Sequence, residues 1–293
     1  MPMAFLTVAK IRARLINDTD IDAVADLLAR GFRSFNRQFW RRALTRLGER
    51  PTPAGLPQYG YLLEYNGARV GVILLIFSTS RSGDRLTTRC NLSSWYVERA
   101  FRGYAPLLVS QALKRKNITY LNISAAPHTR PIVESLGFSR CSNGLFVAIP
   151  ALHSRSSDGQ ARIFDSRVDP GVDCDAFERT VLVDHAEYGC ISLWGVTSGR
   201  AYPFVFRPRL LKGFVPCAQL IYCRELGDFV RFARPIGRFL AMRGRPLVII
   251  NADGPIPGLV GKYLGEKMPA YFKGPDRPRW GDLAYTEAAM FGV

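Results

Sequence analysis

A short basic segment contains the residues whose types and spacing suit the binding of a phosphate. The segment covers residues 95–108 (WYVERAFRGYAPLL), between a predicted strand and a predicted helix. Gly103 and Ala105 are small enough to let a phosphate approach the backbone, and Arg99 and Arg102 can add charge-assisted hydrogen bonds. Backbone N–H groups at the start of a helix also bind anions. The segment is therefore predicted to cradle a diphosphate, although plain connecting loops often have a similar composition.

The charge of the chain also favours an anionic partner. The 293 residues include 40 Lys and Arg against 24 Asp and Glu, a formal net charge of +16. The charge is uneven, because residues 1–148 hold 21 basic and 9 acidic residues and so carry +12. Such an excess suits nucleic acid, an anionic membrane surface or a phosphate-rich cofactor, and an Arg-rich solvated surface is the alternative explanation.

The six cysteines indicate neither a metal site nor a disulfide framework. They are scattered without the C-x-x-C spacing of zinc sites, so we expect buried free thiols and no metal. The first residues show no signal-peptide pattern, and the longest apolar run, residues 72–77, is too short to cross a bilayer. The sequence thus predicts a soluble, cytoplasmic protein with no membrane span.

Local patterns predict the elements that position the basic segment. Residues 17–20 supply capping side chains for a helix that ends near Gly31. Asn66-Gly67 suits a type I′ turn between two apolar, β-prone runs. The remaining predictions are helices at 35–47, 106–114 and 131–136, the last closed by Gly137, and strands at 12–16, 59–65, 68–77, 90–97, 118–124 and 145–149. The order β–α–α–β–β–β–α–β–α–β is an α/β pattern with an antiparallel hairpin in its middle and a β–α–β crossover at its end.

A similar order recurs after a polar connector at 153–160. Helices are predicted at 175–187, 228–243 and 257–264, and strands at 190–197, 201–207, 215–223 and 247–252. Pro235 could bend the second of these helices. Leu136-Gly137 and Leu264-Gly265, 128 residues apart, both follow a strand and a short predicted helix. We interpret the chain as a degenerate tandem repeat, with one domain at residues 1–150 and a second at 151–293. Two unrelated α/β domains that share an element order are the alternative.

The element order and the basic segment resemble the GCN5-related N-acetyltransferase (GNAT) superfamily. That family carries the motif Q/R-x-x-G-x-G/A between its fourth strand and its third helix. Residues 100–105 (AFRGYA) match the second half of the motif but begin with Ala instead of Gln or Arg. A second alignment begins at Arg102 and puts Ala105 and Leu107 at the small positions. The sequence at 136–138 (LGF) resembles the residues that close the family's fourth helix.

The resemblance implies a GNAT-like mixed sheet flanked by helices, duplicated in tandem, whose second half has lost cofactor binding. It implies acetyl-CoA or another acyl-CoA as co-substrate and an amine as acceptor. In the family the pantetheine arm lies between the splayed fourth and fifth strands, and the amine attacks the thioester directly, through an oxyanion that a backbone N–H stabilises. The residues placed at the cofactor by this resemblance are Tyr96, Val97, Arg99, Arg102, Gly103, Tyr104, Ala105, Leu107 and Asn122.

The groups that transfer protons are harder to assign. Many family members use a Tyr on the fourth helix, four residues before the Gly, and that position here is Val133. His128, at the start of the same helix, is the best substitute because a His titrates near neutral pH, although a capping or surface role is common for such a residue. Glu98 could deprotonate the amine or simply pair with neighbouring arginines, and Tyr96 is a weaker candidate. Cys90 is expected to be a buried thiol rather than a nucleophile.

Three functions follow from these observations. The first is an N-acyltransferase that acts on a small-molecule or protein amine, with an acidic acyl carrier protein as an alternative acyl donor. The second is a nucleic-acid-associated protein, suggested by the charge and by Phe35, Phe39 and Trp40 among arginines, although the helical spacing of these rings is more typical of a core. The third is a non-catalytic module that binds acyl-CoA.

Overall fold

The computed structural model describes residues 11–82, 85–154 and 161–292, and the chain divides into two compact units. Unit 1 comprises Met1–Tyr120 and unit 2 comprises Leu121–Val293. The sequence pattern suggested a boundary at residue 150. The units divide earlier because strand β6 (Ser139–Ala148) pairs with β11 (Leu247–Ala252) and β12 (Gly261–Lys273), which lie near the end of the chain.

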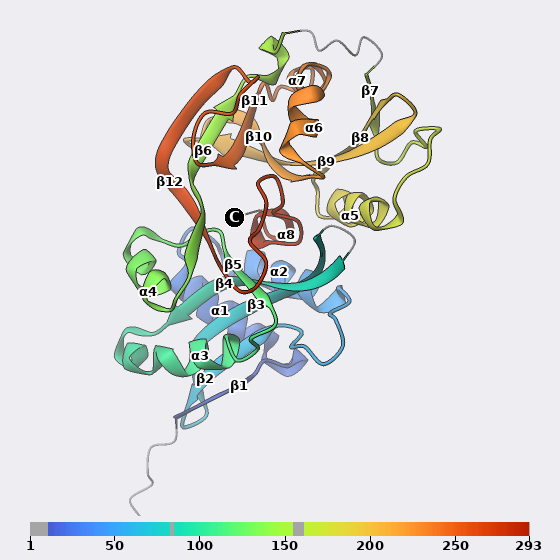
Figure 1. Cartoon of the computed structure of the whole chain (residues 1–293). Coiled ribbons are helices and arrows are strands. Elements are labelled where there is room, and N and C mark those ends of the chain that lie inside the picture. The colour runs from blue at the N-terminus through green and yellow to red at the C-terminus, as the bar shows by residue number, and fades with distance from the viewer. Residues whose placement is uncertain (1–10, 83–84, 155–160, 293) are drawn as a thin grey trace, which may run out of the picture. The chain divides into compact units, whose positions relative to one another are not determined.

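Unit 1 has the order of elements that the sequence predicts (Figure 1). Its elements are β1 (Ile11–Leu15), a 3₁₀ helix η1 (Asp18–Asp20), α1 (Ile21–Gly31), α2 (Arg37–Glu49), β2 (Gly60–Tyr65), β3 (Ala68–Ser82), β4 (Arg85–Val97), a 3₁₀ helix η2 (Arg99–Tyr104), α3 (Ala105–Ala112) and the first half of β5 (Thr119–Asn122). Strands β1 to β4 form an antiparallel sheet in chain order. The turn predicted at Asn66-Gly67 is confirmed, since φ values of 47° and 84° place both residues in the left-handed region that a type I′ turn requires.

The helices of unit 1 cover both faces of this sheet, with α1 and α2 behind the strands and α3 in front in the view of Figure 1. Alternation along β4 sets what each residue contacts. Tyr96 faces α1, because a Cβ added to Gly31 would lie 2.4 Å from its ring. Val97 faces α3 with its cross-strand partner Gly71, where an added Cβ would lie 3.3 Å from Leu108. Gly71 of β3 therefore lets α3 pack closely beside the end of β4.

The aromatic residues around the start of α2 pack on one another. The ring centroids of Phe35 and Phe39 lie 4.4 Å apart, and those of Phe39 and Trp40 lie 5.1 Å apart. Trp40 is buried, with 1% of its surface exposed. The core interpretation is thus confirmed for Trp40, which cannot stack on a nucleic-acid base without leaving the core.

Unit 2 is built on a sheet with the strand order β12-β6-β11-β10-β9-β8-β7. Its remaining elements are η3 (Pro127–Thr129), α4 (Arg130–Ser135), η4 (Pro150–Leu152), β7 (Arg162–Asp165), α5 (Ala176–Glu187), β8 (Ile191–Thr197), β9 (Arg200–Leu211), β10 (Val215–Cys223), α6 (Leu226–Arg231), α7 (Ala233–Ala241) and α8 (Glu287–Met290). Strands β10 and β11 are parallel, and the other described pairs of this sheet are antiparallel.

Two hydrophobic clusters lie on the two faces of the unit 2 sheet. Trp194 and Val205 belong to the cluster that includes residues of α5 and α8, whereas their chain neighbours Leu193 and Phe204 belong to the cluster with α6 and α7. All six cysteines of the chain are free, and five of them are buried, as the scattered spacing predicts. Within the described ranges, the helices are too short or too polar to cross a bilayer.

Most elements predicted in unit 2 are confirmed, but one predicted helix is wrong and another is interrupted. The segment predicted as a helix at 257–264 instead leads into β12, where Tyr263 and Leu264 pair with Phe146 and Leu145 of β6. Leu264-Gly265 therefore lies in a strand and does not close a helix as Leu136-Gly137 does. The helix predicted at 228–243 is two helices that break at Phe232, and Pro235 lies in the first turns of α7, where it removes no hydrogen bond.

Candidate functional site

The basic segment lies where the sequence places it, between β4 and α3, but it is more regular than a loop. Residues Arg99–Tyr104 form the 3₁₀ helix η2, which continues directly into α3 at Ala105. Ala105 is thus the first residue of α3, whereas Leu107 lies within that helix. Ala105 is a small position of the motif in both alignments, so the start of α3 does not choose between them.

The segment is anchored at both ends and open in its middle. Phe101 packs on Tyr65 of β2, with ring centroids 5.0 Å apart, and Leu108 is fully buried on the inner face of α3. The residues between and around these anchors are exposed: Arg99, Arg102, Gly103, Tyr104 and Leu107. No heavy atom lies within 4 Å of a Cβ built on Gly103. A ligand can therefore reach the backbone and both guanidinium groups here.

The backbone donors of the segment are partly used by the protein itself. The N–H of Glu98 donates to Val70 at 2.9 Å, and the N–H of Phe101 donates to Glu98 at 2.8 Å. The N–H of Ala105 donates to the carbonyl of Arg102, as is usual at the end of a 3₁₀ helix. Because η2 uses these amides, the exposed side chains of Arg99 and Arg102 are the most accessible donors for a diphosphate in this conformation.

A β-bulge interrupts β4 just before the segment. Val72 pairs with Tyr96 and Leu74 pairs with Ser93, so β4 contains one residue more than β3 over this stretch. Ser94 has a φ of 51°, a left-handed conformation that is uncommon for a residue other than Gly. A bulge leaves backbone groups out of the ladder, and bulges are frequent beside active sites. The sequence gives no signal for this feature, because Ser has no special preference for positive φ.

The candidate catalytic residues of unit 1 already have protein partners. The ring of Tyr96 rests on Gly31, with its centroid 6.4 Å from that of Phe32. The Glu98 carboxylate accepts a hydrogen bond from Arg30 of α1 at 2.9 Å. The partner of Glu98 therefore lies on α1 and is neither Arg99 nor Arg102, the neighbours that the sequence favours. Burial raises the pKa of the Cys90 thiol well above its ordinary value, which agrees with a buried thiol that is no nucleophile.

The other candidates belong to unit 2. His128 is exposed in η3, and Asn122 is half-buried at the end of β5. Val133, at the position where many GNAT enzymes have a Tyr, is only 3% exposed. That position therefore belongs to the core under α4, and it holds no group that could transfer a proton.

Comparison with known proteins gives a fold but no sequence relative. The sequence matches no family model and no curated protein. A GCN5-related N-acetyltransferase from Anabaena variabilis superposes with a TM-score of 0.58 and 9% identity, covering 90% of this chain and 72% of that protein. One from Kribbella flavida superposes with a TM-score of 0.55 and 14% identity, covering 90% and 71%. An N-acyltransferase candidate from Enterococcus faecalis superposes with a TM-score of 0.57 and 12% identity, covering 90% and 72%.

The chain has the GNAT fold. The structural similarity extends over both units, because the superpositions cover 90% of the residues. Unit 2 repeats the element order that runs from α2 to β5, with two helices in place of α3. The corresponding elements of unit 2 are α5, β8, β9, β10, α6, α7 and β11. Strand β10 also has a register shift between Leu220 and Tyr222, at the place that corresponds to the bulge in β4.

In unit 2 the chain itself pairs with the end of β10, the strand that corresponds to β4 of unit 1. Strands β10 and β11 pair only as far as Gln219 and Ile249. Beyond that point a C-terminal segment, residues 281–283, pairs with β10. The N–H of Cys223 donates to Gly281 at 2.8 Å, and the N–H of Leu283 donates to Ile221 at 2.7 Å. An extended arm could not add to this edge without displacing the C-terminal segment.

The loop after β10 is also poorly suited to a phosphate. Arg224 forms two hydrogen bonds of 2.7 Å with the buried carboxylate of Glu178, so its guanidinium is committed. Glu225 in the same loop and Asp228 in the first turn of α6 add acidic groups there. Unit 2 therefore differs from unit 1 in this loop, because the arginines after β4 are exposed whereas Arg224 is paired with a buried carboxylate.

Proposed function

We propose that the protein is an acyl-CoA-dependent N-acyltransferase and that unit 1 carries its single cofactor site. The GNAT fold supports acyl transfer as the class of reaction. The observation that carries the proposal is the exposed segment after the bulged strand β4, where Arg99 and Arg102 flank the open space over Gly103. A diphosphate bound there would receive charge-assisted hydrogen bonds from both guanidinium groups.

The bulge in β4 would then serve the acyl end of the cofactor. The backbone around Tyr96 and Val97 would bind the pantetheine arm, which places the thioester beside the groups that the bulge frees from the ladder. The amine nitrogen attacks the thioester carbonyl carbon, and a backbone N–H stabilises the oxyanion. The C–S bond then breaks, the thiolate takes up a proton, and the amine nitrogen gives one up.

Proton transfer in this proposal does not depend on a Tyr from α4. Glu98, held by Arg30 of the same unit, is the candidate base. Orientation of the amine and the thioester alone can supply a large part of the rate. The proposed acceptor is an amine of a small molecule or a protein, and the acyl donor is acetyl-CoA, another acyl-CoA or an acyl carrier protein.

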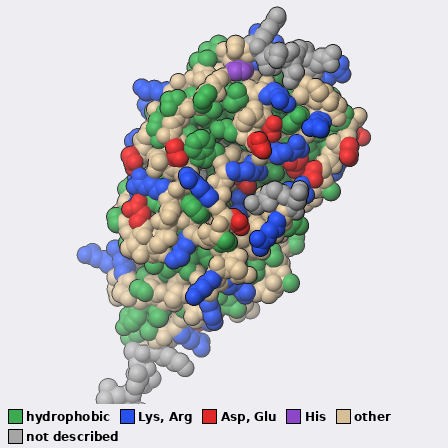
Figure 2. Space-filling model, in the orientation of Figure 1, with side chains coloured by type: hydrophobic (Ala, Val, Ile, Leu, Met, Phe, Trp, Pro, Cys, Tyr) green, Lys and Arg blue, Asp and Glu red, His purple; other side chains and the backbone are tan. Residues whose placement is uncertain are grey.

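The charge pattern favours this proposal over binding along a nucleic acid. Figure 2 shows Lys and Arg side chains scattered over the visible face with Asp and Glu side chains among them. A protein that follows a nucleic-acid backbone concentrates its basic residues in a patch or stripe. Among the described residues, the face drawn in Figure 2 shows no such stripe, which supports a local basic site.

Calorimetric titration with CoA tests the proposal. The double substitution Arg102→Glu, Gly103→Glu should abolish measurable binding, because it places two negative charges where the diphosphate would lie. The variant should still fold, since Gly103 has open space around its Cβ position and Arg102 is exposed.

The matched control is Arg42→Glu, which reverses the charge of an exposed Arg on α2, away from the segment. It should bind CoA as the unsubstituted chain does. Equal CoA affinity in the double variant and in the unsubstituted chain would contradict the placement of the cofactor. Release of free CoA thiol from acetyl-CoA in the presence of a panel of amines then tests turnover.

A further inference from the structure

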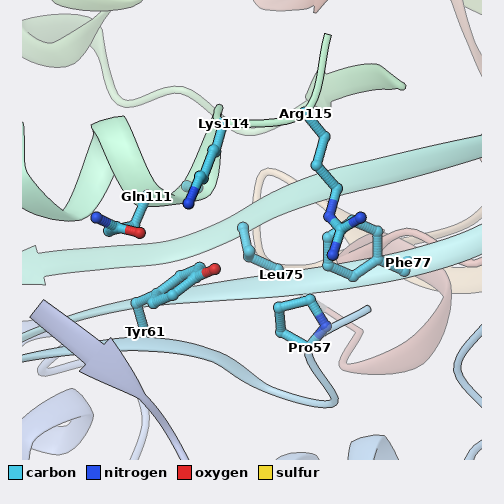
Figure 3. Close-up of a pocket in the computed structure, with 8 residues that line it drawn as sticks. Pro57, Tyr61, Leu75, Phe77, Gln111, Lys114 and Arg115 are labelled. Atoms are coloured by element: carbon cyan, nitrogen blue, oxygen red, sulfur yellow. The ribbon is translucent and has the colours of Figure 1, made fainter. Parts of the chain in front are cut away.

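A pocket of about 380 Å³ opens in unit 1 at the end of α3 that is farther from the basic segment (Figure 3). Its volume lies within the range of about 300–1,000 Å³ that is typical of small-molecule sites. The pocket is lined by Pro57, Tyr61, Leu75, Phe77, Gln111, Ala112, Lys114 and Arg115. These residues come from the loop before β2, from β2, from β3 and from the C-terminal end of α3.

Two apolar side chains of β3 belong to the lining of the pocket. Leu75 and Phe77 are 1% and 2% exposed, and as residues i and i+2 of β3 they face the same side of the sheet as α3. Tyr61 of β2 adds an aromatic ring to one wall, as Figure 3 shows. Burial raises the pKa of the Tyr61 hydroxyl, so this group remains a protonated hydrogen-bond donor at neutral pH.

The mouth of the pocket is cationic. Lys114 and Arg115 follow α3 directly, and Figure 3 shows both side chains reaching from the helix end toward Tyr61 and Phe77. The Arg115 guanidinium also donates to the carbonyl of Gly55, which fixes its position. The eight lining residues include no Asp or Glu, so two positive charges at the mouth face an uncharged interior.

We propose that this pocket binds a small organic anion with a flat apolar body, whose anionic group lies between Lys114 and Arg115 and whose body lies against Phe77. A carboxylate with an aromatic body is the simplest ligand of this class. The Tyr61 hydroxyl would donate a further hydrogen bond to the anionic group, since within the described ranges it has no acceptor of its own.

The pocket is distinct from the proposed acyl-CoA site. Gly103 precedes the first residue of α3, and Lys114 follows its last residues, so the eight-residue helix separates the two sites. At 1.5 Å per residue this helix is about 12 Å long. A ligand in the pocket therefore need not compete with CoA, and the inference does not depend on the proposed function.

Titration with 2-naphthoate, followed by calorimetry, tests the proposal. The probe should bind the unsubstituted chain in a saturable way with one site per chain, and the neutral isostere 2-naphthamide should bind at least about tenfold more weakly. Lys114→Glu should weaken 2-naphthoate by about tenfold or more, because it exchanges an attractive charge at the mouth for a repulsive one. Gln111→Trp, which fills the pocket from its wall, should abolish binding of both compounds.

The control variant is Lys116→Glu, which changes the net charge equally at an exposed residue that does not line the pocket. It should leave the affinity for 2-naphthoate within about twofold of the unsubstituted value. The proposal is overturned if 2-naphthoate shows no saturable binding, if Lys114→Glu and Lys116→Glu weaken it equally, or if Gln111→Trp binds it normally. Saturating CoA should leave the affinity of the probe unchanged, and competition between the two would place the probe elsewhere.

Discussion

The contact between Gly281 and Cys223 provides a quantitative test of how the C-terminal segment seats on β10. Gly281 has a φ of 77°, and a Cβ built on it would lie 2.5 Å from the Cys223 Sγ. Gly281→Ala therefore has two costs. The left-handed conformation costs about 1–2 kcal/mol for an Ala, and overpacking against a buried side chain costs about 1–3 kcal/mol.

The sum predicts that Gly281→Ala lowers the free energy of unfolding by about 2–5 kcal/mol. Gly213→Ala is the matched control, because Gly213 has a φ of 82° but no heavy atom within 4 Å of its Cβ position. The control should lose only the backbone part, about 1–2 kcal/mol. Urea unfolding followed by tryptophan fluorescence measures both.

A double-mutant cycle separates the clash from the backbone strain. Removing the sulfur with Cys223→Ala should make the Gly281→Ala substitution less costly, with a coupling energy of about 1–3 kcal/mol. Additive effects of the two substitutions, together with equal losses for Gly281→Ala and Gly213→Ala, would refute the seating of residues 281–283 against β10. The account of a closed edge in unit 2 would then fail as well.

Two further predictions concern pH and stoichiometry. Hydrogen bonds from Arg14 lower the pKa of Asp20 from 3.8 to about 2, so the stabilisation is complete at neutral pH and is lost as the pH falls from about 4 to about 2. Asp20→Asn should therefore lower the free energy of unfolding by about 2 kcal/mol at neutral pH and change it little near pH 2. The control Asp22→Asn, at an exposed ion pair, should have a small effect at both pH values. Equal effects of Asp20→Asn at both pH values would contradict the assignment. Calorimetry should also give one CoA per chain, and a value of two would contradict the closed edge of β10.

The sequence predicts the local elements of unit 1 well because each depends on neighbouring residues. The cap at Asn17 and the turn at Asn66-Gly67 are set by side chains and backbone preferences within a few residues, and both are found where expected. The burial of Trp40 follows equally from the helical spacing of apolar residues. Such features need no knowledge of distant parts of the chain.

The features that were missed depend on contacts between distant residues. The segment after Pro257 has a short helical pattern, but pairing of Tyr263 with Phe146 holds it in β12. The C-terminal segment that pairs with β10 has no sequence signal, because its backbone hydrogen bonds could be made by many residue types. The same holds for the bulge at Ser94 and for the 3₁₀ turn that engages the amides of residues 101 and 105.

The candidate site is therefore predictable in its position but not in its donors. The types of Arg99, Arg102 and Gly103 point to an anion, and the structure leaves all three exposed. The partner of Glu98 was not predictable, because Arg30 lies 68 residues earlier in the chain. Likewise, only the fold shows that Val133 is buried.

Amide hydrogen exchange with and without CoA tests the central claim most directly. The account predicts that CoA slows exchange in peptides covering residues 94–108, where the bulge, η2 and the start of α3 lie, and leaves peptides covering residues 220–228 of unit 2 unchanged. Unchanged exchange at 94–108 under saturating CoA, or protection at 220–228 in its place, would contradict it.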